Sequence, residues 1–376
     1  MDKVKKRDSN LELYRIVVML LIVAHHYVVN SGIMDKIYTD VLSAKSLFLL
    51  LFGAWGKTGI NCFVLITGYF MCKSNITLKK FAKLLLEVFF YRTVISIVFW
   101  ITSYSPLTIG NFLRQAVVIR DIGTGFTAAY LMFFLTIPFI NILINNLTEK
   151  QHIYMILLFT FIYVFFETVP FFSVRMNYVS WFIVLYMIAS YIRLYPKKLF
   201  EKRNLFGALT LVLILISAAS VVLGAYIYKL TKINIIYDFV TDSNTLLALL
   251  LGLASFLFFK NINLKYSKFI NIVSASCYGV LLIHSNSYVM RGWLWKDFLK
   301  VSQMYYSDYL FLHAILSVIG IYIICTIIDF LRIKFIEKPF FRWWDKFEPK
   351  LITFWKNTES KIFSKMNVGE WGEKYD

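Results

Sequence analysis

Long apolar runs are the feature that most constrains how this chain folds. Residues 13–29, 84–101 and 205–227 are each long enough for a transmembrane helix, which needs about 17–25 largely apolar residues. The runs lack the alternation of a membrane β-strand, so they predict helices rather than a barrel. Only 16% of the residues are charged, where a soluble domain has about a quarter. We therefore expect an all-α fold, a polytopic transmembrane helix bundle.

The apolar runs predict about ten membrane-spanning helices. Their expected ranges are 13–30, 46–71, 84–103, 126–144, 153–169, 179–195, 204–228, 243–259, 269–290 and 309–331. An even number puts both termini on one side of the membrane. If that side is the cytosol, 27 of the 40 Lys and Arg residues lie inside, 10 lie outside, and Arg15, Lys57 and Arg92 lie within spans. Because cytosolic loops are enriched in Lys and Arg, this division predicts cytosolic N- and C-termini.

Charge and cysteine placement argue against several other classes of protein. The net charge of +18 lies mostly between the apolar runs, so we expect a lipid bilayer and no nucleic acid as partner. Cys62, Cys72, Cys277 and Cys325 form no C-x-x-C pair, so neither a disulfide framework nor a zinc site is expected. The sequence leaves the oligomeric state open.

The end of the chain differs from the rest. After Leu331, basic residues are mixed with aromatic ones such as Trp343 and Trp344, which is typical of a short helix on the inner leaflet. We therefore expect two parts, a transmembrane domain of residues 1–335 and a cytosolic basic and aromatic tail of residues 336–376.

The first expected helix carries three ionisable residues, Arg15, His25 and His26, which are costly inside a membrane and therefore informative. Arg15 and His26 are 11 residues apart, so at about 100° per residue they share one face and lie about 16 Å apart along the axis. His25 points about 80° away from Arg15. Each residue alone has a structural explanation, since Arg15 can pair with Glu12 and His26 can bond a neighbouring helix. Two on one face favour a functional site.

A second polar group lies near the outer end of the ninth expected helix. His284 is expected at the depth of His26, and two histidines beside hydroxyl and amide groups suit acid–base chemistry. The neighbouring candidates are Tyr278, Ser285 and Asn286. No His-x-x-x-His pair and no cluster of carboxylates accompanies them, so no metal is expected.

Two further polar groups flank the end of the second expected helix and the loop after it. Lys57 and Asn61 are four residues apart and share a helix face. Lys79, Lys80 and Lys83 follow the helix, and their ammonium groups suit an anionic ligand. A solvated, positively charged cytosolic loop is the simpler interpretation of these three lysines.

A last pattern is the order of several short motifs. They are Asn10–Leu11–Glu12–Leu13–Tyr14 before Arg15-x10-His26, Gly59–Ile60–Asn61 with Gly68–Tyr69–Phe70, Trp181–Phe182 with Tyr191–Ile192–Arg193, Ser276–Cys277–Tyr278–Gly279–Val280 with Leu282–Ile283–His284, and Ile336–Glu337–Lys338–Pro339–Phe340. In this order they resemble the acyltransferase family 3 membrane proteins, of the type that O-acylates polysaccharides and surface glycans.

The resemblance implies a ten-helix core that uses cytosolic acyl-CoA and acylates a carbohydrate at the outer face. It implies that His26 is the catalytic residue and that Arg15 helps to place the acyl donor. Many members of the family have an Arg-x-x-Arg pair after the second helix, and here Lys80 and Lys83 stand in that place. Lysine keeps the charge and loses the bidentate contact with phosphate.

We therefore expect an integral membrane O-acyltransferase, with acyl-CoA as co-substrate and no bound cofactor. Acetyl is the default acyl group, and succinyl is the alternative. Arg15, Lys79, Lys80 and Lys83 are expected to hold the nucleotide end of the donor. His26, neutral in apolar surroundings, is expected to deprotonate a sugar hydroxyl, and an acyl-histidine intermediate is the alternative route. His284 is the second catalytic candidate.

Two other classes of function stay open at this point. A transporter or flippase for a glycan or small anion would use the same buried charges as a permeation path. A structural subunit would tolerate replacement of His26. As acceptors, capsule, exopolysaccharide, teichoic acid and lipid-linked oligosaccharide are all compatible with the sequence. The Lys-, Ile-, Asn- and Phe-rich composition suggests a low-GC bacterium, and the expected location is then the bacterial plasma membrane.

Overall fold

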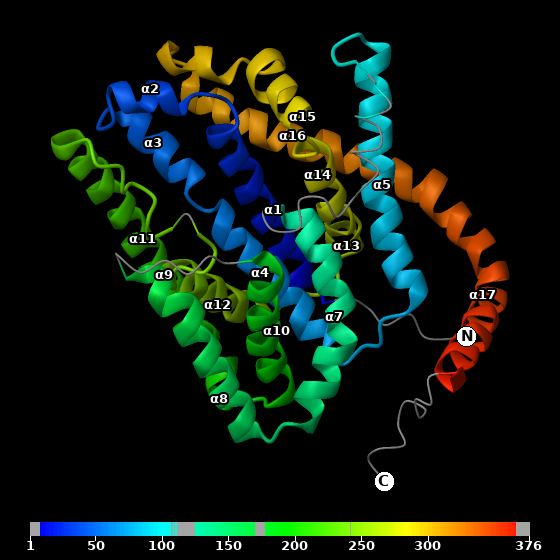
Figure 1. The fold of residues 1–376 in the computed structure, drawn as a ribbon. Helices are drawn as coiled ribbons and strands as arrows, with labels where there is room; N and C mark the ends of the chain where they lie inside the picture. Colours follow the sequence, from blue (N-terminus) through cyan, green and yellow to red (C-terminus); the bar gives the residue numbers. More distant parts are fainter. Residues whose placement is uncertain are drawn as a thin grey trace. The chain divides into compact units, whose positions relative to one another are not determined.

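The computed structural model describes residues 8–106, 108, 110, 125–169, 177–240 and 242–365, and every regular element in them is a helix (Figure 1). The principal helices are α1 (Ser9–Val29), α2 (Met34–Thr39), α3 (Ala44–Gly53), α4 (Gly56–Met71), α5 (Leu78–Ile101), α7 (Phe126–Asn146), α8 (Glu149–Thr160), α9 (Phe166–Thr168), α10 (Tyr178–Leu194), α11 (Arg203–Thr231), α12 (Leu246–Lys260), α13 (Lys268–Ala275), α14 (Cys277–His284), α15 (Tyr288–Gly292), α16 (Leu310–Arg332) and α17 (Lys338–Lys365). Short 3₁₀ and π turns link several of them.

The described helices contain seven segments that are long and apolar enough to cross a bilayer. A bent pair that begins at Lys268 makes eight if it counts as one span, and α10 and α12 are shorter apolar helices of 17 and 15 residues. All of these fall on predicted ranges, so the expectation of a polytopic helical bundle is confirmed, and the number of ten spans stays a prediction. The side of the membrane on which the termini lie stays a prediction.

The expected helix 46–71 is divided into two, which corrects the prediction of one continuous helix. α3 ends at Gly53 and α4 begins at Gly56, two glycines that each weaken a helix interior by about 0.5–1 kcal/mol relative to alanine. A helix end leaves carbonyl groups without a helical partner. Here the Gly53 carbonyl accepts a hydrogen bond from His25 Nδ1 at 2.6 Å, so a side chain of α1 stabilises the break.

The expected helix 269–290 also needs correction, because it ends early, at His284. The chain bends by 92° there, and the next helical segment begins at Tyr288. The bend falls on Ser285–Asn286–Ser287, and the Ser287 side chain caps α15 by accepting a backbone hydrogen bond. Ser and Asn favour turns and caps because they bond the nearby backbone, and that preference ends the helix.

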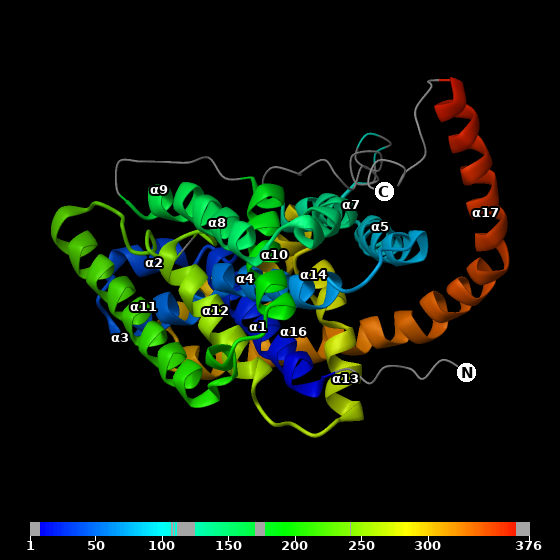
Figure 2. The ribbon, with the colours of Figure 1, turned by 90° about the horizontal axis from the view of Figure 1, so that it is seen from below.

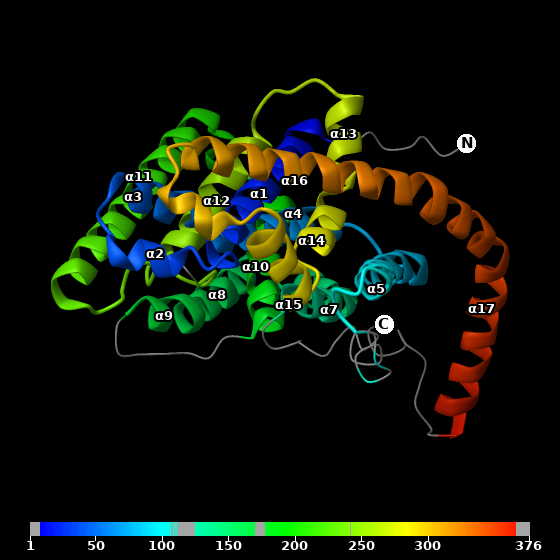
Figure 3. The ribbon, with the colours of Figure 1, turned by 90° about the horizontal axis from the view of Figure 1, so that it is seen from above.

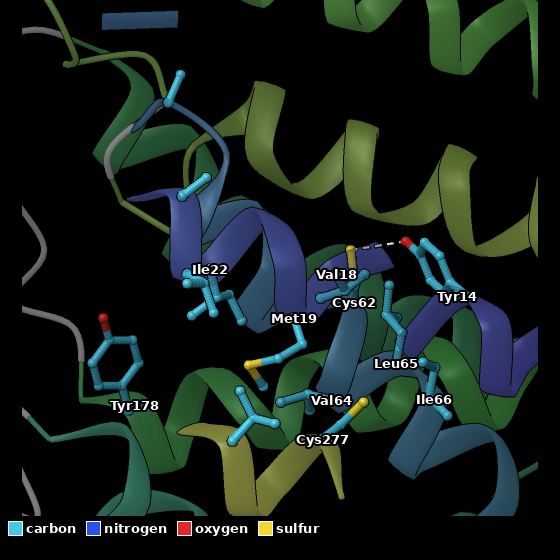
Figure 4. Packing of buried hydrophobic residues seen from close by; sticks show 14 of the residues in the cluster. Tyr14, Val18, Met19, Ile22, Cys62, Val64, Leu65, Ile66, Tyr178 and Cys277 are labelled. Carbon is cyan, nitrogen blue, oxygen red and sulfur yellow. Dashed lines mark hydrogen bonds between the residues drawn. The ribbon is translucent and has the colours of Figure 1, made fainter. Parts of the chain in front are cut away.

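α1 is the helix around which the first compact unit, up to Ile327, is arranged (Figures 2 and 3). It contacts α3, α4, α12, α13 and α14. Against α4, a Cβ at Gly59 would lie 2.9 Å from Ile22 Cγ1, so only glycine permits this approach. Figure 4 shows the interface, in which the Tyr14 hydroxyl donates to Cys62 Sγ at 2.8 Å. The packing fixes the rotation of α1 about its axis.

The second unit begins at Ile328 and contains the predicted 336–376 tail. Inside it, the buried Arg332 guanidinium bonds Asp329 and Glu337, each at 2.8 Å, so these charges are paired where they are buried. The expected short tail helix is in fact the 28-residue α17, with Pro349 inside it. Exposed aromatic residues and lysines alternate along α17, the composition of an interfacial helix.

Candidate active site

A cavity of about 580 Å³ lies inside the first unit, among α1, α4, α5, α7, α10 and α13 to α15. On α1 its lining begins at Arg15 and ends at Asn30, 15 residues or about 22 Å along the axis. We call its two extremes the Arg15 end and the Asn30 end. Figure 4 shows Met19 of α1 with Tyr178 and Cys277, which line the cavity from α10 and α14. The cavity therefore follows the face of α1 that the sequence singled out.

His26 and His284 meet at the Asn30 end. His26 Nδ1 lies 2.8 Å from His284 Nε2, and His284 is fully buried at the C-terminus of α14. The other ring nitrogen of His284, Nδ1, lies 2.6 Å from the Val280 carbonyl oxygen. The two imidazoles thus form a chain that starts on a backbone acceptor and ends on a histidine that lines the cavity.

The hydrogen-bond network assigns the tautomers of this pair. A carbonyl oxygen only accepts, so His284 Nδ1 carries a proton and donates it to Val280. In neutral His284 the Nε2 atom then holds a lone pair and accepts from His26 Nδ1–H. Neutral His26 therefore keeps its own lone pair on Nε2. His284 holds His26 in the tautomer that a general base needs.

His25 makes a different set of contacts from its neighbour. Its Nδ1 bonds the Gly53 carbonyl at the α3–α4 break, and its ring packs on Gly56, where a Cβ would lie 2.3 Å from His25 Cγ. His25 nevertheless lines the cavity, although the helical arithmetic turned it about 80° away from Arg15. Both rings line the cavity. The two histidines therefore differ in their hydrogen-bond partners and not in whether they reach the cavity.

Arg15 combines the two interpretations that the sequence left open. Its Nη1 atom bonds Glu12 Oε1 at 2.9 Å, as a local ion pair predicts, and the same guanidinium lines the cavity. Glu12 is buried and also accepts a hydrogen bond from Ser274 Oγ at 2.5 Å. Guanidinium carries five N–H donors, so a cation anchored by Glu12 keeps donors for a ligand.

The three loop lysines do not act as one group. Only Lys83 lines the cavity, together with Arg15. Lys80 is exposed and donates to Ser74 Oγ and to the Asn75 carbonyl, both at 2.7 Å, so it closes the turn before α5. Lys79 is absent from the described lining. The site therefore contains one of the three expected lysines.

The remaining candidates divide between the cavity and the packing around it. Those that line the cavity are Lys57, Tyr278, Ser285 and Asn286. Lys57 Nζ donates to the Tyr178 hydroxyl at 2.8 Å. Asn61 does not line the cavity; its side chain is fully buried, donates to the Ser243 carbonyl at 2.6 Å and accepts from Trp181 Nε1 at 2.9 Å. These bonds give Asn61 a packing role.

Several lining residues were not among the predicted site residues, and those with charged or phenolic side chains include Glu87, Arg92, Tyr178 and Arg291. The rule that marked Arg15, an ionisable residue inside an apolar run, applies equally to Glu87 and Arg92 in α5 and would have found them. Arg291 is different, because it reaches the cavity only through the bend after His284. Among the described residues no group of three metal-ligating side chains is gathered.

The comparison with protein families agrees with this architecture. Seven or eight candidate spans and a polar cavity among the described helices are the architecture of a multi-pass membrane protein with an internal site. A model of the acyltransferase domain of acyltransferase family 3 matches residues 8–330, and the chain belongs to this family. It is a membrane acyltransferase, as the sequence motifs predicted. No curated protein and no solved structure matches the chain.

Proposed function

We propose that this membrane acyltransferase moves an acyl group, acetyl by default, from acyl-CoA to a hydroxyl of a surface or lipid-linked glycan. The observation that carries the proposal is the pair of His26 and His284 at one end of a cavity whose other end holds Arg15. In a bacterial plasma membrane with the N-terminus in the cytosol, the Arg15 end faces the donor and the Asn30 end faces the acceptor.

The donor fits the length and charge of the cavity. Acyl-CoA has a phosphate-rich nucleotide end and a slim, neutral arm that ends in the thioester. Arg15 and Lys83, which both line the cavity, suit the phosphates, since guanidinium and ammonium groups form charge-assisted hydrogen bonds to phosphate oxygen. The arm then extends about 16 Å along α1 to the level of His26.

The proton transfers follow from the tautomer of His26. Its Nε2 lone pair takes the proton of the acceptor hydroxyl while the hydroxyl oxygen attacks the thioester carbonyl. The tetrahedral intermediate collapses as the C–S bond breaks, and the thiolate of CoA takes the proton back from Nε2. His284 stabilises the imidazolium by accepting from Nδ1–H throughout. In the alternative route, Nε2 attacks the thioester first and forms an acyl-histidine.

The start of α4 supplies positive potential where the oxyanion forms. Gly56 and Lys57 are the first residues of α4 and line the cavity beside His25. The N-cap residue, Trp55, makes no side-chain cap hydrogen bond, so the first amides of the helix have no such partner. Helix N-termini favour negative charge, and a water-poor site strengthens the effect. The α3–α4 break thus contributes to catalysis in this proposal.

Two measurements test the proposal. Mass spectrometry of surface glycans from cells with and without the protein should find an acyl ester that depends on it. Purified protein in nanodiscs, given acetyl-CoA and isotopically labelled CoA without acceptor, separates the two routes, because label enters acetyl-CoA only if an acyl-enzyme forms. Identical glycans in both cells, together with no acetyl-CoA turnover in nanodiscs, would refute the proposed function.

A further inference from the structure

A second cavity, of about 400 Å³, lies at the start of α1, separate from the candidate active site. Its lining comes from the first turn of α1, the last turn of α4, the end of α12 and the segment before α13. The lining residues are Asp8, Ser9, Asn10, Leu11, Tyr69, Lys260, Leu264 and Tyr266. With the N-terminus in the cytosol, this cavity lies at the cytosolic end of the first unit.

Three of the short sequence motifs meet at the second cavity. Asn10 and Leu11 belong to the motif before Arg15, Tyr69 belongs to the motif at the end of α4, and all three residues line the cavity. Arg193, from the motif near the end of α10, donates from Nη1 to the Tyr69 hydroxyl at 2.8 Å, and its guanidinium lies 4.7 Å from the centre of the Tyr69 ring. None of these four residues lines the first cavity, so the candidate active site does not explain their motifs.

The cations at the second cavity form no ion pair with a carboxylate among the described residues. Lys260 Nζ donates to the Asn261 side chain at 3.0 Å, and an ammonium has three N–H donors, so two remain for a ligand. Arg193 and Glu201 both act electrostatically on Lys260, with opposite signs. Asp8 is the acidic residue of the lining, and it is exposed.

This mixture of groups suits a nucleotide. The Lys260 ammonium is a point charge of the kind that binds phosphate. The Asp8 carboxylate only accepts hydrogen bonds, so it suits the hydroxyl groups of a ribose or the amino group of a base. Tyr69 and Tyr266 bring aromatic rings, on which bases stack. A bare anion would use the ammonium alone and would be repelled by the carboxylate.

The second cavity also lies where the donor would continue beyond its diphosphate. Leu11 lines the second cavity and Arg15 the first, and their spacing of four residues puts them on one face of α1, about 6 Å apart along the axis. On α4, Thr67 lines the first cavity and Tyr69 the second. From His26, the order along α1 is therefore thioester, arm, diphosphate and then adenosine.

We infer that the second cavity binds the adenosine 3′-phosphate end of the acyl donor, and that Lys260 binds the 3′-phosphate group. This inference rests on the proposed function, because it assigns a further part of the same donor. Arg15 and Lys83 then hold the diphosphate, which lies between the adenosine and the arm. The donor is selected at two separate places, by its thioester at His26 and by its nucleotide at the start of α1.

The test measures binding, so it needs no acceptor. The full chain in phosphatidylcholine nanodiscs is titrated with CoA, with 3′-dephospho-CoA and with adenosine 3′,5′-bisphosphate. We expect CoA to bind roughly 10-fold or more tightly than 3′-dephospho-CoA, as for the loss of a hydrogen bond between charged groups. Adenosine 3′,5′-bisphosphate, which lacks the arm, should displace CoA.

Variants then assign this preference to the second cavity. Lys260→Gln should bring the ratio of the two dissociation constants close to one by weakening CoA and sparing 3′-dephospho-CoA. Lys260→Arg keeps the charge and should keep most of the preference. Lys265→Gln is the matched control, because Lys265 is an exposed lysine of the same segment, between two lining residues, and does not itself line the cavity. We expect it to leave the ratio unchanged.

Three results would overturn the inference and leave the proposed function standing. Equal affinity for CoA and 3′-dephospho-CoA in the wild-type chain would show that the 3′-phosphate is not recognised. Equal weakening of both ligands in Lys260→Gln would assign Lys260 to another part of the donor. If phosphatidylglycerol nanodiscs weaken CoA binding more in the wild-type chain than in Lys260→Gln, the cavity holds a lipid headgroup. The proposed function fails separately if CoA does not bind and acetyl-CoA is not turned over.

Discussion

The two ends of the cavity hold different kinds of polar group on the same helix. At the Arg15 end, Arg15 is an ion anchored by a buried carboxylate, Glu12, which is itself held by Ser274. At the Asn30 end, the central groups are two imidazoles, His26 and His284, ordered by a backbone carbonyl rather than by an acid. The contacts at the Arg15 end therefore hold a permanent charge in place, and those at the Asn30 end orient the Nε2 lone pair of His26.

Under the proposed function, this difference separates donor binding from proton transfer along α1. A guanidinium keeps its charge throughout and suits the fixed charges of a donor, whereas a neutral imidazole suits a proton that must come and go. A nearby carboxylate would favour the charged form of His26, and the carbonyl of Val280 supplies orientation without that charge. The predictions below test whether the two ends are as separate as their bonds indicate.

The largest effect is expected at His26. His26→Ala removes the Nε2 base, which is worth about 10²–10⁴-fold in rate, so acyl transfer should be nearly abolished. Binding of CoA should be largely retained, because the nucleotide end is held about 16 Å away. The measurement is acyl transfer in nanodiscs, with CoA binding and thermal stability as controls. Loss of CoA binding in this variant would show that the two ends are not separate.

The second effect concerns His284, whose role we expect to be the positioning of His26. His284→Leu removes the acceptor for His26 Nδ1–H, and we expect a loss of roughly 10- to 100-fold in kcat, as for other groups that orient a catalytic histidine. His284→Gln offers a side-chain oxygen in its place and should recover part of the loss.

A structural role and a positioning role of His284 give different results. If His284 only fills space, Leu and Gln variants should differ in thermal stability and not in kcat, and the KM for acyl-CoA should stay unchanged in both. Higher kcat in His284→Gln than in His284→Leu, at matched stability, supports the tautomer argument. Equal kcat in the two would contradict it.

The third effect is expected at the Arg15 end. Arg15→Ala would remove the ion pair of buried Glu12, so loss of stability would obscure the binding effect. The double variant Arg15→Gln with Glu12→Gln removes both charges and keeps the fold testable. We expect KM for acyl-CoA to rise about 10-fold with kcat less affected, and Arg15→Lys to show an intermediate KM. Unchanged KM in the double variant would leave Arg15 as an anchor only.

The sequence analysis predicted the helices and missed the breaks within them. Apolar runs of bilayer length report where the chain crosses the membrane, because nothing else accommodates them. The α3–α4 break depends on His25, which bonds the Gly53 carbonyl from 28 residues away in sequence. The bend after His284 has a local signal, Ser285–Asn286–Ser287, which the apolar pattern outweighed.

Some features of the candidate site were likewise predicted from the sequence, and others were missed. The spacing of Arg15 and His26 was enough to place them on one helix face, since that relation depends on helical geometry alone. The lysines after the second helix were grouped by charge, and the structure separates Lys83 from Lys80 because a turn captures the Lys80 ammonium. Asn61 shared a face with Lys57, but its amide is used by α10 and the segment before α12. Long-range hydrogen bonds of this kind leave no periodic signal.

The smallest effect is expected at His25, one residue from the proposed base. His25→Ala leaves the Gly53 carbonyl at the α3–α4 break without its donor, so we expect a loss of thermal stability and a fall in transfer of only a few-fold. His25→Asn is the matched variant, because its amide can donate from a position close to that of Nδ1 and should restore both quantities. Both rings line the cavity, so measuring His25→Ala and His26→Ala in one assay tests whether their different hydrogen bonds give them different roles. An inactive His25→Ala beside an active His26→Ala would reverse the assignment. If both variants stay active, the base lies elsewhere, and His284 becomes the first residue to test.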